Sequence, residues 1–179
     1  MTRSGLCLAL ALALVGGCRR EAPPGPPGEP AGPAPSPISA ADALDLLDER
    51  DPLPLLPRMA SHQKRDMREH LVAVQEIVAG LAAGDFAAVE TAAGRMGSSE
   101  DTEQRCTHMG AGAPGFTEQA LGFHRAADRI AAAARERDAG RVLAELGATL
   151  ETCTSCHATW KQQLVDEATW RRRAAAATP

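Results

Sequence analysis

The apolar residues of this chain recur every three or four positions, and this spacing constrains its fold more than any other feature. Between Met67 and Leu81 they form one stripe of an α-helix, which Gly84 is expected to end. The same spacing predicts three further helices, over residues 86–96, 116–134 and 142–164. No stretch shows sustained two-residue alternation, so we expect no β-strands. The pattern therefore predicts an all-α fold.

Short turns at 84–85 and 138–140 favour antiparallel packing of neighbouring helices, while residues 97–115, rich in glycine and serine, are expected to be a long loop. We therefore predict an antiparallel four-helix bundle. Only 3% of the residues are aromatic, so a bulky apolar group from outside the sequence would help to fill its thin core. A formal net charge of −4 gives no basic patch that would favour nucleic acid.

Residues 1–17 have the form of a signal peptide, with an apolar run of ten residues that is too short to span a bilayer. The run ends in Gly16-Gly17-Cys18, which resembles the bacterial lipobox, so Cys18 is expected to become the lipidated N-terminus. An ordinary secretory signal with a cysteine at its end by chance is the alternative. The arginine after Cys18 favours the outer membrane, by resemblance to enteric lipoproteins. We expect a periplasmic lipoprotein, anchored to the membrane.

The rest of the chain divides by composition. Residues 18–37 hold the lipidated cysteine and a proline-rich linker, whose stiff, extended backbone would separate the domain from its anchor. Residues 38–58 are expected to form a short helix and a connector, because a capping box begins at Ser39. The bundle domain is expected over 59–170, and 171–179 is expected to be a solvated basic tail.

The sequence Cys153-Thr154-Ser155-Cys156-His157 carries the most specific chemical signal in the chain. C-x-x-C-H is the attachment motif of a c-type haem. Two thiols add to the two vinyl groups at one porphyrin edge, and the adjacent imidazole reaches the iron. On a helix, Cys153, Cys156 and His157 share one face with Trp160. The motif predicts one covalent haem c, with Cys153, Cys156, His157 and Trp160 in contact with it.

Two other types of site use C-x-x-C. A thioredoxin-like redox pair would follow a strand within a βαβ unit, which this sequence does not predict. A zinc site would need a second pair of ligands, and Cys106 with His108 is a poor match to one. Cys106 is expected to be a free thiol, or to pair with another chain.

The combination of a helical bundle with a C-terminal C-x-x-C-H motif resembles the class II cytochromes c, the cytochrome c prime family, over Met59 to Trp170. That family has its haem motif on the last helix and the opposite axial residue on the first. The resemblance implies that Lys161, four residues after His157, lies beside the haem. The long loop that contains Cys106 departs from the family pattern.

His157 is the expected proximal iron ligand, whereas the opposite ligand has four candidates on the first long helix. Relative to the centre of the apolar stripe, Met67 lies at about 20° and His70 at about 45°. Met59 lies at about 65° and His62 at about 125°. We therefore favour Met67 as the ligand, with His70, Met59 and His62 as alternatives, and an open coordination position as a further one.

These features favour an electron carrier rather than an enzyme, because methionine and histidine ligands would keep the iron six-coordinate. Its partners would be redox proteins at the membrane, and homodimer formation is left open. The alternative function is a five-coordinate haem protein that binds or senses nitric oxide or carbon monoxide. It would apply if the first helix presents only an apolar side chain to the iron.

Overall fold

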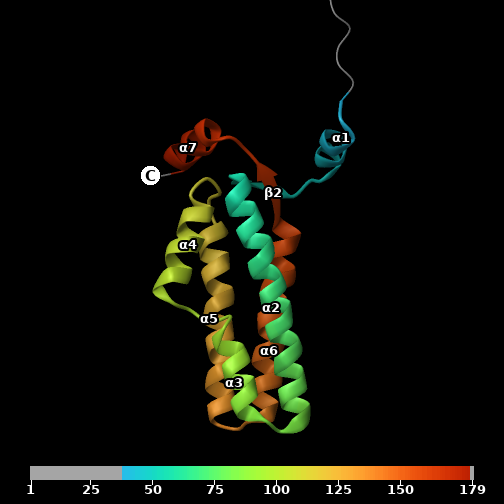
Figure 1. Ribbon diagram of the computed structural model, residues 1–179, viewed down its shortest axis with the longest axis vertical. Helices are drawn as coiled ribbons and strands as arrows, with labels where there is room; N and C mark the ends of the chain where they lie inside the picture. The colour runs from blue at the N-terminus through green and yellow to red at the C-terminus, as the bar shows by residue number, and fades with distance from the viewer. Residues whose placement is uncertain (1–37, 178–179) are drawn as a thin grey trace, which may run out of the picture. The chain divides into compact units, whose positions relative to one another are not determined.

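The computed structural model describes residues 38–177, and most of them are helical (Figure 1). The prediction of a predominantly helical fold is therefore confirmed. The described helices are α1 (Ala40–Leu47), α2 (Pro57–Ala83), α3 (Phe86–Gly94), α4 (Glu100–Gly110), α5 (Phe116–Arg135), α6 (Ala139–Thr159) and α7 (Glu167–Ala176). Two short strands, β1 (Asp51–Leu55) and β2 (Trp160–Leu164), complete this part of the chain.

Local signals set the ends of the central helices. Gly84 ends α2 in a left-handed conformation (φ 69°) that glycine adopts without strain, and its N–H bonds to the carbonyl of Leu81. Asp85 begins α3 by accepting a hydrogen bond from the N–H of Ala88. Asp138 begins α6 in the same way. The predicted end of a helix at Gly84 is therefore confirmed, whereas α6 begins at Ala139, within the turn predicted over 138–140.

The main core lies where α3 packs on α2 and where α5 packs along both α3 and α6. Its side chains are mostly small, so the helices approach one another closely. The larger fully buried members are Ile77, Val89, Met96, Ile130 and Val142. Cys153 is half-buried and packs against the edge of this core.

The expectation that the chain contains no strands is wrong. β1 pairs in parallel with β2, with Asp51 opposite Trp160 and Leu55 opposite Leu164. The predicted continuation of the last helix to Leu164 is also wrong, because α6 ends at Thr159 and Trp160 is already extended. Residues 160–164 include good helix formers, but pairing with a segment more than 100 residues away overrides that preference.

The expected loop over 97–115 contains α4, so this prediction is also wrong. Ser99 caps the helix by accepting a hydrogen bond from the N–H of Thr102, and acidic residues occupy the first turn. Cys106 and Met109 of α4 are buried. Much of the segment expected to be a solvated tail is likewise helical, in α7.

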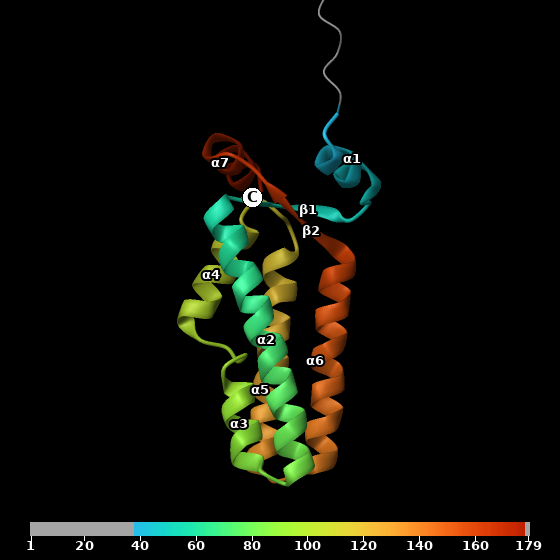
Figure 2. The ribbon, with the colours of Figure 1, turned by 45° about the vertical axis from the view of Figure 1, so that its right-hand side comes forward.

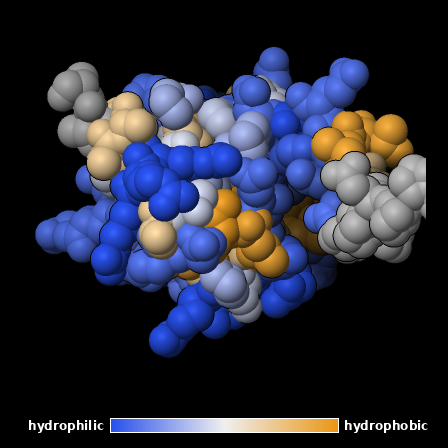
Figure 3. Space-filling model, turned by 90° about the horizontal axis from the view of Figure 1, so that it is seen from above, coloured by the Kyte–Doolittle hydropathy of each residue, from blue (hydrophilic) through white to orange (hydrophobic). Residues whose placement is uncertain are grey.

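None of the helices in residues 38–177 combines the length and the apolar character needed to cross a membrane. The expected signal peptide, Cys18 and the proline-rich linker lie outside the described residues. Figure 3 views the protein from the end that carries α1 and α7 and shows mainly hydrophilic side chains, with apolar ones between them.

Two neighbouring residues of α2 test the position of the core. Ile77 is fully buried and Val78 is 51% exposed. Replacing Ile77 by alanine should lower the free energy of unfolding by about 2–5 kcal/mol, because it leaves a cavity in a packed core. Val78→Ala is the matched control and should change it by less than about 0.5 kcal/mol. Urea denaturation followed by circular dichroism measures both; equal effects would contradict this packing.

Candidate functional site

A cavity of ≈ 660 Å³ is lined by residues of α2, α5 and α6, together with residues next to and within the two strands. α2 and α6 are nearer to each other beside the α2–α3 turn than beside β2 (Figure 2). The apolar lining of the cavity includes Leu53, Leu71, Val74, Phe116, Phe123 and Leu150. This volume lies in the range of cofactor and small-molecule sites.

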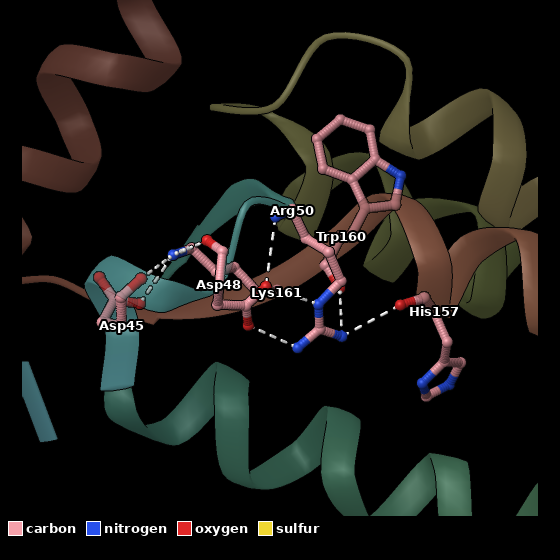
Figure 4. A network of polar contacts seen from close by, with 6 residues as sticks. All are labelled: Asp45, Asp48, Arg50, His157, Trp160 and Lys161. Atoms are coloured by element: carbon pink, nitrogen blue, oxygen red, sulfur yellow. Dashed lines mark hydrogen bonds and ion pairs between the residues drawn. The ribbon is translucent and has the colours of Figure 1, made fainter. Parts of the chain in front are cut away.

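The CTSCH motif lies in the last two turns of α6, and Cys153, Cys156 and His157 all line this cavity. Both cysteines are free and half-buried. Burial raises the pKa of each thiol, and the neighbouring Cys153 raises that of Cys156 further. Figure 4 shows the imidazole of His157 pointing away from the polar network around Arg50. The motif therefore brings two thiols and an imidazole to one wall.

Of the four candidate axial ligands on α2, only Met67 and His70 line the cavity. Met67 is 39% exposed. His70 lies against Phe123, with ring centroids 4.7 Å apart, and against His124 at 5.7 Å. Burial, together with the nearby His124, lowers the pKa of His70 to about 4, so its imidazole is neutral at pH 7.

The other two candidates are engaged elsewhere. Met59 packs against a second apolar cluster that is built on Leu53 and Leu55 of β1. The ring of His62 contacts Arg65 and lies 3.4 Å from the carboxylate of Asp66. Neither Met59 nor His62 lines the cavity, although Cys156 and Trp160 pack against the same apolar cluster as Met59.

His124 is buried beside the cavity, and its Nδ1 donates a hydrogen bond of 2.7 Å to the carbonyl of Met96. Burial is the main cause that lowers its pKa. The ring of His124 meets that of His70 edge to face, so the two imidazoles pack together on this side of the cavity.

Trp160 lines the cavity at the start of β2 and is held by a residue that the sequence did not single out. Its Nε1 donates to Oε1 of Gln119 at 2.7 Å, and Nε2 of Gln119 donates to Oγ of Ser155 at 3.0 Å. The ring also meets the edge of Phe116 at 5.8 Å. Gln119, which also lines the cavity, therefore joins α5 to the motif, a role that no local sequence pattern indicates.

The charged residues that line the cavity are all basic: Arg50, Lys64, Arg68 and Lys161. The Nζ of Lys161, however, bonds to the carbonyls of Asp45 and Asp48 and lies 3.0 Å from the carboxylate of Asp45. Sequence reasoning missed Arg50, which precedes β1. Arg50 and Lys161 are paired with Asp48 and Asp45, so it is mainly Lys64 and Arg68 that favour an apolar ligand with negatively charged groups.

Among residues 38–177, no three or more side chains of the types His, Cys, Asp and Glu are grouped as ligands of a metal ion. Cys106 is buried in α4, and the ring of His108 lies tilted against that of Trp170, with centroids 4.9 Å apart. These two residues therefore do not complete a site with Cys153 and Cys156.

Comparison of this chain with protein-family models, with curated proteins and with solved structures finds no match. The cavity itself is therefore the feature of this chain that indicates a function. Its essential features are two thiols and an imidazole on α6, a thioether and a neutral imidazole on α2, and basic residues beside them.

The thiol of Cys106 should be unreactive in the folded protein. Burial raises its pKa to about 11, so only ~0.1% is thiolate at pH 8. Alkylation by iodoacetamide, followed at Cys106 by peptide mass spectrometry, should therefore be more than about 100-fold slower than in the urea-unfolded chain. Equal rates in the two states would show that Cys106 is not buried.

Proposed function

We propose that this chain is a c-type cytochrome that carries electrons, with α2, α3, α5 and α6 forming an antiparallel four-helix bundle around one covalent haem. The single observation that carries the proposal is that both thiols and the imidazole of CTSCH line one largely apolar cavity. A redox pair or an isolated zinc site would not need such a cavity beside it.

The residues of the cavity fit a haem in size and in chemistry. The apolar walls suit the porphyrin ring, while Lys64 and Arg68 are exposed cations beside the cavity that suit its carboxylates. Cys153 and Cys156 would hold the ring through thioether bonds, and His157 would be the proximal ligand. A bound haem supplies an iron that gains and loses one electron.

Met67 is the proposed second axial ligand, since it lines the cavity from α2 and lies nearest the centre of the apolar stripe. A thioether and an imidazole as the two ligands would keep the iron six-coordinate in both oxidation states. His70 is the competing donor, because its ring is neutral and held by Phe123. The aromatic side chains of α5 would exclude water from this side.

We also propose that the carrier is exported and tethered to a membrane through Cys18. The lipobox-like sequence and the proline-rich linker support this, and both lie outside the described residues. A tether would raise the local concentration of the carrier around redox partner proteins in the same membrane. Periplasmic electron transfer, rather than catalysis, is therefore the proposed role.

Gas binding is the second candidate function, and the apolar Leu71 and Val74 favour it because they line the cavity on the same helix as Met67. If one of these side chains faces the iron, a coordination position stays open for nitric oxide or carbon monoxide.

Covalent haem is tested by mass. The chain, produced with haem-maturation machinery, should be coloured and heavier by one haem, and the Cys153→Ala/Cys156→Ala variant should lose that mass. Cys106→Ala is the matched control, because Cys106 lies away from the cavity, and it should keep the haem. A colourless wild-type protein without added mass would overturn the proposed function.

The axial ligand is tested by optical spectra. The wild-type protein should show a sharp reduced α-band, and Met67→Ala should give a broad high-spin spectrum that changes with carbon monoxide. His70→Ala, on the same helix, should leave the low-spin spectrum in place. A high-spin spectrum in His70→Ala but not in Met67→Ala would assign the ligand to His70. A wild-type protein that is already high-spin would support gas binding.

A further inference from the structure

The C-terminal end of α6 is held by a residue from far earlier in the chain. α6 ends at Thr159, two residues after His157, and the final carbonyls of a helix have no partner within it. Nη1 of Arg50 donates to the carbonyl of His157 at 3.0 Å and to that of Trp160 at 3.2 Å (Figure 4). Arg50 therefore caps the turn that carries the imidazole.

Arg50 is itself fixed by Asp48. Nε and Nη2 of the guanidinium donate to the two carboxylate oxygens of Asp48 at 2.9 and 2.7 Å, and the backbone N–H of Arg50 donates to the same carboxylate at 3.2 Å. These bonds lower the pKa of Asp48 to about 2, so the carboxylate stays ionised at neutral pH. The planar guanidinium thus binds Asp48 with one edge and α6 with another nitrogen.

Lys161 makes the reciprocal connection. Its Nζ donates to the carbonyls of Asp45 and Asp48, at the end of α1 and just after it, at 2.7 and 2.8 Å. Arg50 thus binds the carbonyls of His157 and Trp160, and Lys161 binds those of Asp45 and Asp48. Both sets of bonds are next to the Asp51–Trp160 pair of the two strands. The end of α6 is joined to residues 45–51 by hydrogen bonds in both directions.

We propose that Arg50 is a positioning residue for His157: its guanidinium fixes the last turn of α6 and so the direction of the imidazole toward the cavity. This inference rests on the proposed function, in which His157 binds iron. Arg50 also lines the cavity, so its positive charge disfavours the more positive, oxidised form of a bound haem. Arg50 would therefore affect a bound haem in two ways: it positions His157, and its charge disfavours the oxidised form.

Two substitutions separate position from charge in the haem-loaded full chain. Arg50→Lys keeps the charge but loses the planar fork, whereas Arg50→Gln loses both. Asp48→Asn keeps Arg50 and weakens its support. Arg58→Gln is the matched control, because Arg58 is an exposed arginine of α2 that does not line the cavity.

Hydrogen exchange at the backbone amide of Trp160, which bonds to the carbonyl of Cys156, reports on the last turn of α6. Arg50→Lys and Arg50→Gln should each speed this exchange by about tenfold, because a charged hydrogen bond to the helix end is lost. Asp48→Asn should speed it less, and Arg58→Gln should leave it unchanged. Both Arg50 variants should also show a larger high-spin fraction, and Arg50→Gln alone should have a clearly lower midpoint potential.

The outcomes separate this inference from the function on which it rests. A haem-bearing Arg50→Gln protein with wild-type exchange, spectrum and potential would overturn the positioning role and leave the cytochrome proposal intact. If Arg50→Gln gives no folded protein, Asp48→Asn and Arg50→Lys decide by the same measurements, and wild-type behaviour in both would also overturn it. A wild-type chain without haem would overturn the proposed function itself.

Discussion

The parallel pairing of β1 with β2 is the interaction on which the site depends. It joins segments that are more than 100 residues apart and ends α6 at Thr159. Without it, the good helix formers of residues 160–164 would extend α6 by more than a turn. Because the pairing starts at Trp160, three residues after His157, the same contact ends the helix and sets one wall of the cavity.

The small side chains of the core explain why a cavity forms at one end of the helices. Alanine residues on α3 and α5 let these helices approach their neighbours closely near the α2–α3 turn. Toward β2 the divergence of α2 and α6 leaves space that the sequence does not fill, since only 3% of its residues are aromatic. The chain therefore supplies apolar walls without the side chains that would occupy the space between them.

Local patterns predicted the central helices because their apolar stripes and their turns at Gly84 and Asp138 are short-range signals. β2 was missed because its partner is distant. α4 was missed because a glycine-rich and serine-rich context obscured the cap at Ser99.

Helical geometry separated the four candidate ligands on α2. The two with the smallest angular offsets, Met67 and His70, line the cavity, while Met59 and His62 do not. Arg50 has no local signature, because its partners are carbonyls that any sequence provides.

The hydrogen bonds at the end of α6 also determine how the protein would respond to mechanical load. A force applied to the chain ahead of α1 would act in order on Asp45, Asp48, Arg50 and the Asp51–Trp160 pair, before it reached α2. Tension would therefore reach the hydrogen bonds that Lys161 and Arg50 make beside the C-terminal end of α6 before it reached the packed core.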